Sequence, residues 1–254
     1  MKVFITGGTG KLGKELVKVF PGSIHPRHRE LDITDKVSLC QYVQENLPEV
    51  IIHCAALASI RRCEENKELA YKINVEGTEN LVRTCLEYKK DCYFVYISTA
   101  CIFYGDKGDY VETDIPYPKN FYSFTKLLGE FVVKYSGLKK WLIIRTNFVS
   151  RERWPYPKAF IDRYGTYLFA DDLAGAINSV LEDNLTGVVH ICGQEKISMF
   201  ELAKITTPDI KPMTLAEYYG PPLTVDMSLR SLRINPLKMY KIKTKDQEHP
   251  RPDS

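Results

Sequence analysis

The sequence lacks a long apolar run at its start and any large excess of charge. The opening MKVFITGGTG holds an apolar run far too short for a signal peptide or a membrane-spanning helix. Lysine and arginine number 35 against 32 acidic residues, so the formal net charge is only +3. So small a charge gives no reason to expect binding to nucleic acid or to a membrane surface. We therefore predict no partner of either kind.

Cysteine is present, but not in the spacing that metal sites or disulfide scaffolds use. The seven cysteines are scattered, without C-x-x-C spacing and without a histidine cluster. This pattern argues against a zinc site and against a disulfide framework, and it fits the reducing cytoplasm. We accordingly predict no metal ligands and a cytoplasmic location.

Internal repeats and long linkers are also missing, which favours a single folded unit. The chain has 254 residues, of which 44% are hydrophobic and 26% charged, as in ordinary soluble globular proteins. This length can bury a full core as one α/β domain, or as one domain with a small appendage.

A glycine-rich turn near the N-terminus is the first motif that is present. Residues 3–6 are typical of a short buried strand, GGTGKLG follows at once, and an amphipathic helix comes next. Gly7 permits a tight turn, Gly10 lets a pyrophosphate approach the backbone, and Gly13 lets the helix pack closely on the strand. The helix N-terminus then offers free N–H groups to the phosphates. We favour a dinucleotide-binding turn over a merely flexible loop.

A basic cluster stands near the end of the expected second strand, at residues 23–25. Arg27, His28 and Arg29 occupy the region in which NAD-binding folds place an acidic residue for the adenosine ribose. Two arginines and a histidine suit a 2′-phosphate, so NADP is favoured over NAD. A solvated basic turn is the alternative interpretation.

Further strand and helix patterns alternate along the chain. A helix capped by Thr34 or Asp35 is expected up to residue 46, then a buried strand at 50–53 and one or two helices within 64–88. In this last region Asn74 is either a satisfied core amide or part of a proton relay. Four such units with short connections predict a parallel, doubly wound sheet with its ligand crevice at the strand C-termini.

The stretch from Ser98 to Lys126 carries the candidate chemistry. An apolar strand ends at Ser98 and Thr99, and a turn-rich loop leads to Tyr122 and Lys126 at the start of a helix. A spacing of four puts these two side chains on one helical face, where a lysine cation would lower the tyrosine pKa. With the strand-end hydroxyl, they can move a proton on or off a carbinol oxygen while a hydride moves elsewhere. A Tyr/Lys pair on a solvated helix is the alternative, but the convergence of motifs on one sheet edge favours the catalytic interpretation.

The second half of the chain predicts a return to the sheet and a smaller appended region. Basic and aromatic residues alternate in 151–164, where they either hold a diphosphate and stack on a base or form an ordinary surface loop. Ser198-x-x-Glu201 is a capping box that predicts a helix start. We expect an NADP-binding Rossmann domain at 1–150 with returns from 165–195, a small discontinuous substrate-binding region at 151–240, and a solvated tail at 241–254.

Several segments together resemble the extended short-chain dehydrogenase/reductase superfamily, namely TGGTGKLG, Cys54-Ala55-Ala56, Ser98-Thr99 and Y-x-x-x-K. More narrowly, IFYGDKGDYVETDIPYP, FYSFTKLLGE, LIIRTNF and YLFADDLAGAI are similar to segments of dTDP-4-dehydrorhamnose reductases. The resemblance covers most of residues 1–205. It implies a Rossmann-type, doubly wound parallel sheet with a small C-terminal substrate-binding subdomain. It also implies reduction of an NDP-4-keto-6-deoxy sugar by NADPH.

The predicted site residues form three sets. By the resemblance, Thr99, Tyr122 and Lys126 are catalytic, with Tyr122 as the proton donor. Besides Tyr122 and Lys126, the expected cofactor-binding residues are Gly7, Thr9, Gly10, Lys11, Leu12, Gly13, Arg27, Asp32, Ile33, Cys54, Ala55 and Ala56. The expected substrate-binding residues are Cys101, Asn147, Arg151 and Trp154.

Two features depart from the reductase pattern. The reductases usually have Asp-Tyr after the catalytic threonine, where this chain has Ala100 and Cys101, and the segment after Arg145 is shorter than theirs. GDP-fucose synthases look similar in having a cysteine at this offset, where the thiol is an acid/base group. No histidine lies within 146–165 to partner the thiol, so a small buried residue is the favoured interpretation of Cys101.

Two other functions stay open. One is an NDP-sugar epimerase or epimerase/reductase of the same superfamily. The other is a non-catalytic dinucleotide-binding subunit, because the regulatory subunit of methionine adenosyltransferase resembles this reductase family. The presence of Thr99, Tyr122 and Lys126 together argues against a pure binder. Folds of this class often pair through helices, so a homodimer is a further expectation.

Overall fold

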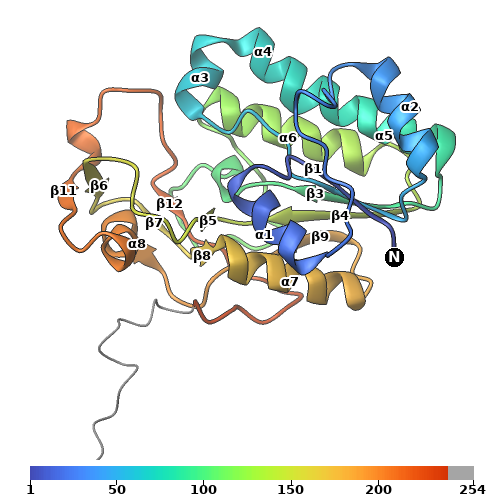
Figure 1. The fold of residues 1–254 in the computed structure, drawn as a ribbon. Coiled ribbons are helices and arrows are strands. Elements are labelled where there is room, and N and C mark those ends of the chain that lie inside the picture. Colours follow the sequence, from blue (N-terminus) through green and yellow to red (C-terminus); the bar gives the residue numbers. More distant parts are fainter. Residues whose placement is uncertain (240–254) are drawn as a thin grey trace, which may run out of the picture.

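The computed structural model describes residues 1–239, and its centre is a five-stranded parallel sheet. The strands are β1 (Val3–Thr6), β2 (Val50–His53), β3 (Tyr93–Ile97), β4 (Lys140–Arg145) and β9 (Gly187–His190). They lie in the order β1-β2-β3-β4-β9, each parallel to its neighbours (Figure 1). The predicted fold class, a Rossmann-type parallel α/β sheet, is confirmed.

Helices cover both faces of this sheet, as Figure 1 shows. One face packs on α1 (Lys11–Val19) and α7 (Ala170–Glu182). The other packs on α2 (Lys36–Asn46), α5 (Gly77–Tyr88) and α6 (Phe121–Lys134). Because successive strand side chains point to opposite faces, Val3 and Ile5 join the first core while Phe4 joins the second. The strands are therefore buried on both sides, as parallel sheets require.

The expected strand at 23–25 is reduced to a single bridge between Ile24 and Phe4. The Ile24 N–H donates to the Val3 carbonyl oxygen, and its own carbonyl accepts from Ile5 N–H, both at 2.8 Å. Proline at 21 and 26 brackets this short segment, and proline has no N–H to extend a ladder. The chain nevertheless reaches the outer edge of β1, which puts the basic cluster beside the glycine-rich turn.

The helical region predicted within 64–88 is divided into four pieces. They are α3 (Ile60–Glu65), α4 (Lys67–Tyr71), a π-helical turn (Lys72–Glu76) and α5. The division before α4 follows from Asn66, whose side chain accepts from Leu69 N–H and caps that helix. The predicted cap of α2 is Asp35, whose side chain accepts from Val37 and Ser38 N–H groups.

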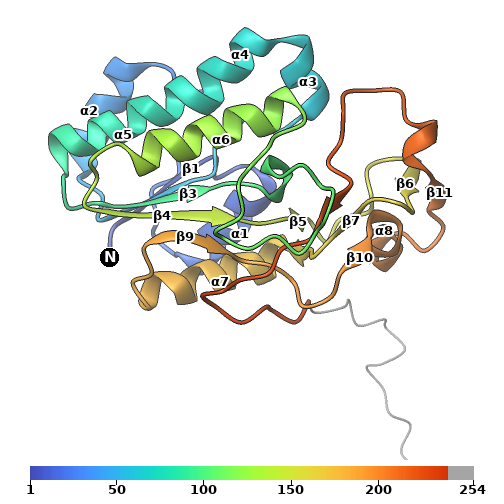
Figure 2. The same ribbon diagram turned by 180° about the vertical axis from the view of Figure 1, so that it is seen from behind.

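A smaller lobe is built from the chain after β4, and Figure 2 shows it from behind. β7 (Tyr164–Gly165) lies between β10 (Ile197–Ser198) and β12 (Asp226–Met227). β6 (Lys158–Phe160) pairs with β11 (Lys211–Met213), and β5 (Phe148–Val149) with β8 (Leu168–Phe169). α8 (Met199–Thr206) begins with the predicted capping box of Ser198 and Glu201.

Between these pieces the chain returns to the main sheet through α7 and β9. The domain boundaries stay a prediction, and the tail expected at 241–254 lies outside the described residues. No helix within residues 1–239 has the length and apolar character needed to cross a membrane.

Gly13→Ala should destabilise the protein, because a Cβ at this position of α1 would overlap the Gly7 carbonyl oxygen. The matched control is Gly175→Ala in α7, where an added Cβ meets no atom within 4 Å. That control should raise stability by about 0.5–1 kcal/mol, since alanine favours helix more than glycine does. Thermal unfolding of both variants checks the pair, and a Gly13→Ala protein as stable as the wild type would refute the close packing of α1 on the turn.

Candidate active site

The glycine-rich turn leaves β1 in a conformation that requires glycine. Gly7 has a φ of +70°, and a Cβ there would lie 2.8 Å from the Ala55 backbone nitrogen. A cavity of about 310 Å³ opens beside the turn. Of the predicted cofactor-binding residues, this cavity is lined by Gly7, Thr9, Gly10, Asp32, Ile33, Cys54, Ala55 and Ala56. Its place beside the glycine-rich turn and the start of α1 suits an adenine dinucleotide.

A buried polar network supports the wall of this cavity. Thr6 and Thr78 hydroxyls lie 2.6 Å and 3.0 Å from the two ring nitrogens of His53. Because the Thr78 hydroxyl donates to the Asn74 carbonyl, it must accept from His53 Nε2–H. Burial lowers the pKa of His53 to about 3, so the ring is neutral and both of its nitrogens are satisfied. The network fixes the strand end from which Cys54, Ala55 and Ala56 project.

Asn74 completes that network as a satisfied amide. Its Oδ1 accepts from Leu57 N–H at 2.7 Å, and its Nδ2 donates to the Leu57 carbonyl and to the Thr125 hydroxyl. Of the two interpretations of Asn74, the contacts favour the core amide. It joins the cavity wall to α6, the helix that carries Tyr122 and Lys126.

The structure separates the members of the basic cluster. His28 lines the cavity together with Asp32, and the two side chains are 4.0 Å apart. Arg27 is exposed and lies outside the lining, although its backbone N–H is held by Glu30. Lys11 is exposed on α1 and faces a different cavity, and Leu12 is buried in the core.

Thr99 stands at the end of β3, where the predicted hydroxyl pair leaves the sheet. Ser98 N–H donates to the Ile144 carbonyl and Ala100 N–H to the Thr146 carbonyl, so both neighbours of Thr99 are held to β4 and its continuation. The Thr99 hydroxyl accepts from Cys101 N–H and caps a short 3₁₀ turn at Ala100–Ile102. The same hydroxyl is close enough to the Tyr122 phenol to lower its pKa.

Tyr122 and Lys126 lie one turn apart on α6, whose start is held from two sides. The Asn120 side chain caps the helix by accepting from Ser123 and also donates to the Pro222 carbonyl. Glu64 of α3 accepts from Phe121 N–H at 2.7 Å. The Lys126 ammonium is buried, 4.0 Å from the centroid of the Tyr96 ring.

A buried ion pair connects this helix to the strand ends. The Arg145 guanidinium at the end of β4 bonds both carboxylate oxygens of Glu130 on α6, at 2.8–3.2 Å. Ser98 donates to the same carboxylate at 2.5 Å. Glu130, one turn after Lys126 on α6, is thus joined directly to Ser98, the residue before Thr99.

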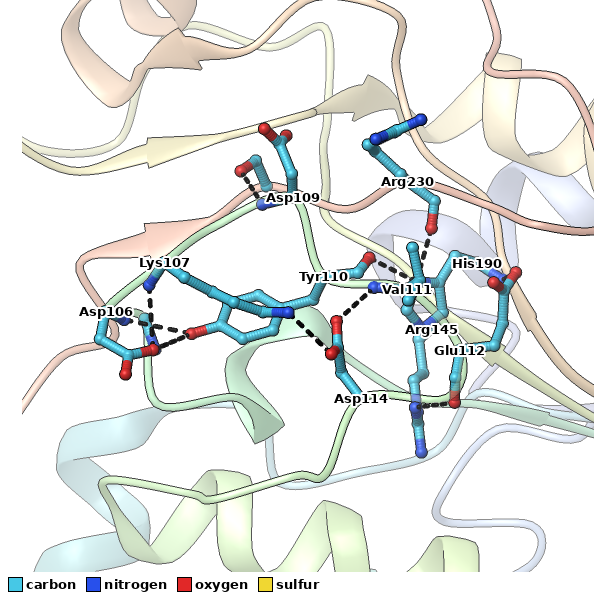
Figure 3. Close-up of polar contacts among 12 residues, drawn as sticks. Asp106, Lys107, Asp109, Tyr110, Val111, Glu112, Asp114, Arg145, His190 and Arg230 are labelled. Carbon is cyan, nitrogen blue, oxygen red and sulfur yellow. Dashed lines mark hydrogen bonds and ion pairs between the residues drawn. The ribbon is translucent and has the colours of Figure 1, made fainter.

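The loop between Thr99 and α6 is held to the same strand ends, as Figure 3 shows. Arg145 donates to the Glu112 carbonyl, and the Glu112 carboxylate accepts from His190 N–H at 2.9 Å. His190 Nδ1 lies 3.0 Å from the Tyr110 carbonyl oxygen, and the Tyr110 phenol donates to Asp106. The loop between Thr99 and α6, which is rich in turn residues, is therefore fixed to the ends of the strands by hydrogen bonds.

Burial shifts the pKa values of the two helical residues in opposite directions. Burial raises the pKa of Tyr122, while the nearby Thr99 hydroxyl partly offsets the rise. The prediction that Lys126 lowers the pKa of Tyr122 below its ordinary value is therefore wrong for this structure. Burial lowers the pKa of Lys126 to about 7, against the opposing effects of Cys54 and Glu130, which weakens its cationic character near neutral pH. Tyr122 therefore keeps its proton at neutral pH and can donate it.

The four residues expected to bind substrate lie in different places. Arg151 bonds Asp171 and Asp172 beside a cavity of about 570 Å³ at the start of α1. Trp154 lines another cavity, of about 610 Å³, between the smaller lobe and residues 58–61 at the start of α3. Cys101 and Asn147 are buried against Met227, through its sulfur and its carbonyl oxygen respectively. The set does not form one pocket.

The structure adds cavity-lining residues that were outside the predicted sets. His28, Leu57 and Ile73 line the dinucleotide cavity, and Arg163 lines the cavity that contains Trp154. Of these, His28 and Arg163 belong to basic runs visible in the sequence, whereas nothing local marks Leu57 or Ile73. Within the described part of the chain, no three His, Cys, Asp or Glu side chains group as metal ligands would.

The sequence matches a known protein family over most of its length. The family described as RmlD substrate binding domain matches residues 1–161, well over half of the chain. The chain belongs to this family. The predicted membership of the NAD(P)-binding extended short-chain dehydrogenase/reductase superfamily is thereby confirmed.

Individual relatives of this RmlD-family chain include both enzymes and a subunit. A dTDP-4-keto-6-deoxy-D-glucose reductase of Streptomyces niveus is 27% identical, over 80% of this chain and 76% of its own length. A methionine adenosyltransferase 2 subunit beta of Xenopus laevis is 35% identical, but over only 52% of this chain and 42% of its own length. A dTDP-4-dehydrorhamnose reductase from Bacillus anthracis, solved with NADP, superposes with a TM-score of 0.82 at 29% identity, covering 91% of each chain.

Lys126→Met should stabilise the protein, and more so at low pH. The folded-state pKa of about 7 lies below the ordinary 10.5, so wild-type stability rises as the pH increases from about 7 toward 10.5. The gain in Tm should therefore be larger at pH 6 than at pH 9, with about 2–4 °C for each kcal/mol in a chain of this size. The control is Lys134→Met, an exposed lysine of the same helix. An equal gain at both pH values would contradict the account of Lys126 burial.

Proposed function

We propose that this protein is an NADPH-dependent oxidoreductase that reduces the 4-keto group of an NDP-4-keto-6-deoxy sugar. The observation that carries the proposal is the meeting of Thr99, Tyr122 and Lys126 beside the glycine-rich cradle at the strand C-termini. Family membership supports it, as does the similarity to reductases that this chain covers over three quarters or more of their length.

The chain's own residues supply the proton and the polar surroundings of the reaction. NADPH, when bound, supplies the hydride. The Tyr122 phenol, protonated at neutral pH because burial raises its pKa, donates its proton to the oxygen of the 4-keto group. The Thr99 hydroxyl, which lies near that phenol, shares the same oxygen. The Lys126 ammonium lies one turn along α6 and stabilises the phenolate left behind.

The cofactor is held by the turn after β1 and by the residues that follow β2, the neighbouring strand. Gly7, Gly10 and the start of α1 cradle the pyrophosphate, and Gly13 allows the close packing that brings α1 there. Preference for NADP over NAD is supported by the exposed Arg27 and Arg29, the chain neighbours of His28, which lines the cavity. The Bacillus anthracis relative with bound NADP supports the same choice.

A dinucleotide-binding regulatory subunit is the second candidate. Its support is the 35% identity to the methionine adenosyltransferase subunit, together with Ala100 and Cys101 after the threonine. The complete catalytic set and the longer match to reductases favour the enzyme. An epimerase or epimerase/reductase is the remaining enzymatic alternative. A homodimer and a cytoplasmic location stay predictions.

Tyr122→Phe should remove turnover while leaving cofactor binding nearly intact. Loss of the proton donor should lower kcat for NADPH oxidation with dTDP-4-dehydrorhamnose by about 10²–10⁴-fold. The affinity for NADPH, followed by fluorescence, should stay within about twofold, because the adenine and pyrophosphate contacts are elsewhere. Tyr117→Phe is the matched control, since Tyr117 is 67% exposed and should tolerate the change.

Two results would contradict the assignment. Undiminished turnover of the Tyr122→Phe protein would show that another group is the acid. Binding of NADPH by the wild type without oxidation in the presence of any 4-keto sugar nucleotide would favour the regulatory subunit.

A further inference from the structure

Arg163 is a buried arginine whose contacts do not balance its charge. Its side chain is buried just before β7, and its Nε donates to the Thr224 carbonyl at 2.9 Å. Its other contacts are to sulfur, with Met199 Sδ at 3.2 Å, Met227 Sδ at 3.1 Å and Cys101 Sγ at 4.0 Å. Thioether sulfur is a weak acceptor. No carboxylate among residues 1–239 forms an ion pair with this guanidinium, whereas the buried Arg145 bonds both oxygens of Glu130.

A second polar group at the same place also lacks a partner. The Tyr167 hydroxyl is buried, and it has no hydrogen-bond partner in the described part of the chain. Its ring packs over Gly165, where any Cβ would collide with it. The Tyr167 ring belongs to the same buried cluster as Cys101 and Met227, the two residues whose sulfur atoms Arg163 contacts. Two donors with too few acceptors therefore meet at one point, and unpaired donors in a protein interior are costly.

This point lies between a cavity and the proposed chemistry. Arg163 and Met199 line the cavity of about 610 Å³ between the smaller lobe and residues 58–61. The same cavity is lined by the aromatic rings of Trp154, Tyr156, Phe160 and Tyr218, which can stack on a base or a sugar. On its other side, Arg163 contacts Cys101, two residues after Thr99. Arg163 thus links the wall of this cavity to the segment that follows Thr99.

We propose that Arg163 is an anion-binding subsite, which takes phosphate or carboxylate oxygens of the substrate at the inner end of this cavity. This inference rests on the proposed function, because it assigns part of the sugar-nucleotide site. An anionic oxygen would replace weak sulfur acceptors with a charge-assisted bond to a planar donor group. The anion is either the diphosphate of the nucleotide or a carboxylate carried by the sugar.

The experiment measures ligand binding by calorimetry in the presence of excess NADP⁺, which keeps probes out of the dinucleotide cavity. Arg163→Met should weaken binding of dTDP and UDP by at least about tenfold (~1.4 kcal/mol) while leaving thymidine and uridine unchanged. If the anion is a sugar carboxylate, the variant instead loses the preference for UDP-glucuronate over UDP-glucose by a similar factor. Arg163→Lys should restore part of either loss, because it returns the charge without the planar fork.

Matched variants separate this role from a merely structural one. Arg153→Met removes an exposed arginine of the same segment, paired with Asp209, and should change none of these affinities. Cys101→Ala should keep the anion effect, because the guanidinium and not the thiol provides it. Arg163→Gln, which retains amide donors, replaces the methionine variant if that protein fails to fold.

The subsite is overturned if the wild type and Arg163→Met bind every anion equally, or if the wild type binds none of them. It is also overturned if Cys101→Ala loses as much affinity for the anions as Arg163→Met, because the arginine would then act only by positioning the thiol. Failure of the proposed reduction is a distinct result, because it would appear as absent turnover while the binding differences persist.

Discussion

The ion pair of Glu130 with Arg145 is the interaction on which the site depends. It is buried, it carries three hydrogen bonds, and Ser98 donates a fourth to the same carboxylate. Through it, α6 is held to the ends of β3 and β4 at the level of Thr99. Removing one partner of such a pair leaves an uncompensated charge in the core, which costs about 3–5 kcal/mol. The relative placement of Thr99, Tyr122 and Lys126 therefore follows from a contact among residues that do no chemistry themselves.

The burial of this site also shifts the pKa values of the groups proposed for proton transfer. A phenol with a raised pKa keeps its proton, and a lysine with a pKa of about 7 is charged only part of the time at neutral pH. Burial of Lys126 costs stability wherever the unfolded chain would carry its charge, whereas the neutral Tyr122 phenol has no such cost. The smaller lobe adds Arg163, a second buried cation that forms no ion pair with a carboxylate of residues 1–239.

Local patterns in the sequence predicted much of this structure. The spacing of Gly7 and Gly13, the pair of Tyr122 and Lys126, and the capping box at Ser198 each act within a few residues, and the structure has these local features. The assignment of roles to the site residues stays a prediction. Properties set by distant contacts were harder to foresee. The direction of the Tyr122 pKa shift was predicted wrongly, because it depends on burial by segments far along the chain.

The region after β4 also depends on distant contacts that the sequence does not predict. Arg151 and Trp154 are three residues apart, yet they line different cavities, and Arg163 owes its environment to Met199 and Met227. Irregular sequence between short strands has no hydrophobic period from which such contacts could be predicted.

The most direct test of the central claim is the stoichiometry of NADPH oxidised per dTDP-4-dehydrorhamnose consumed. The account predicts one NADPH for each sugar reduced; conversion of the sugar with no net loss of NADPH would contradict it.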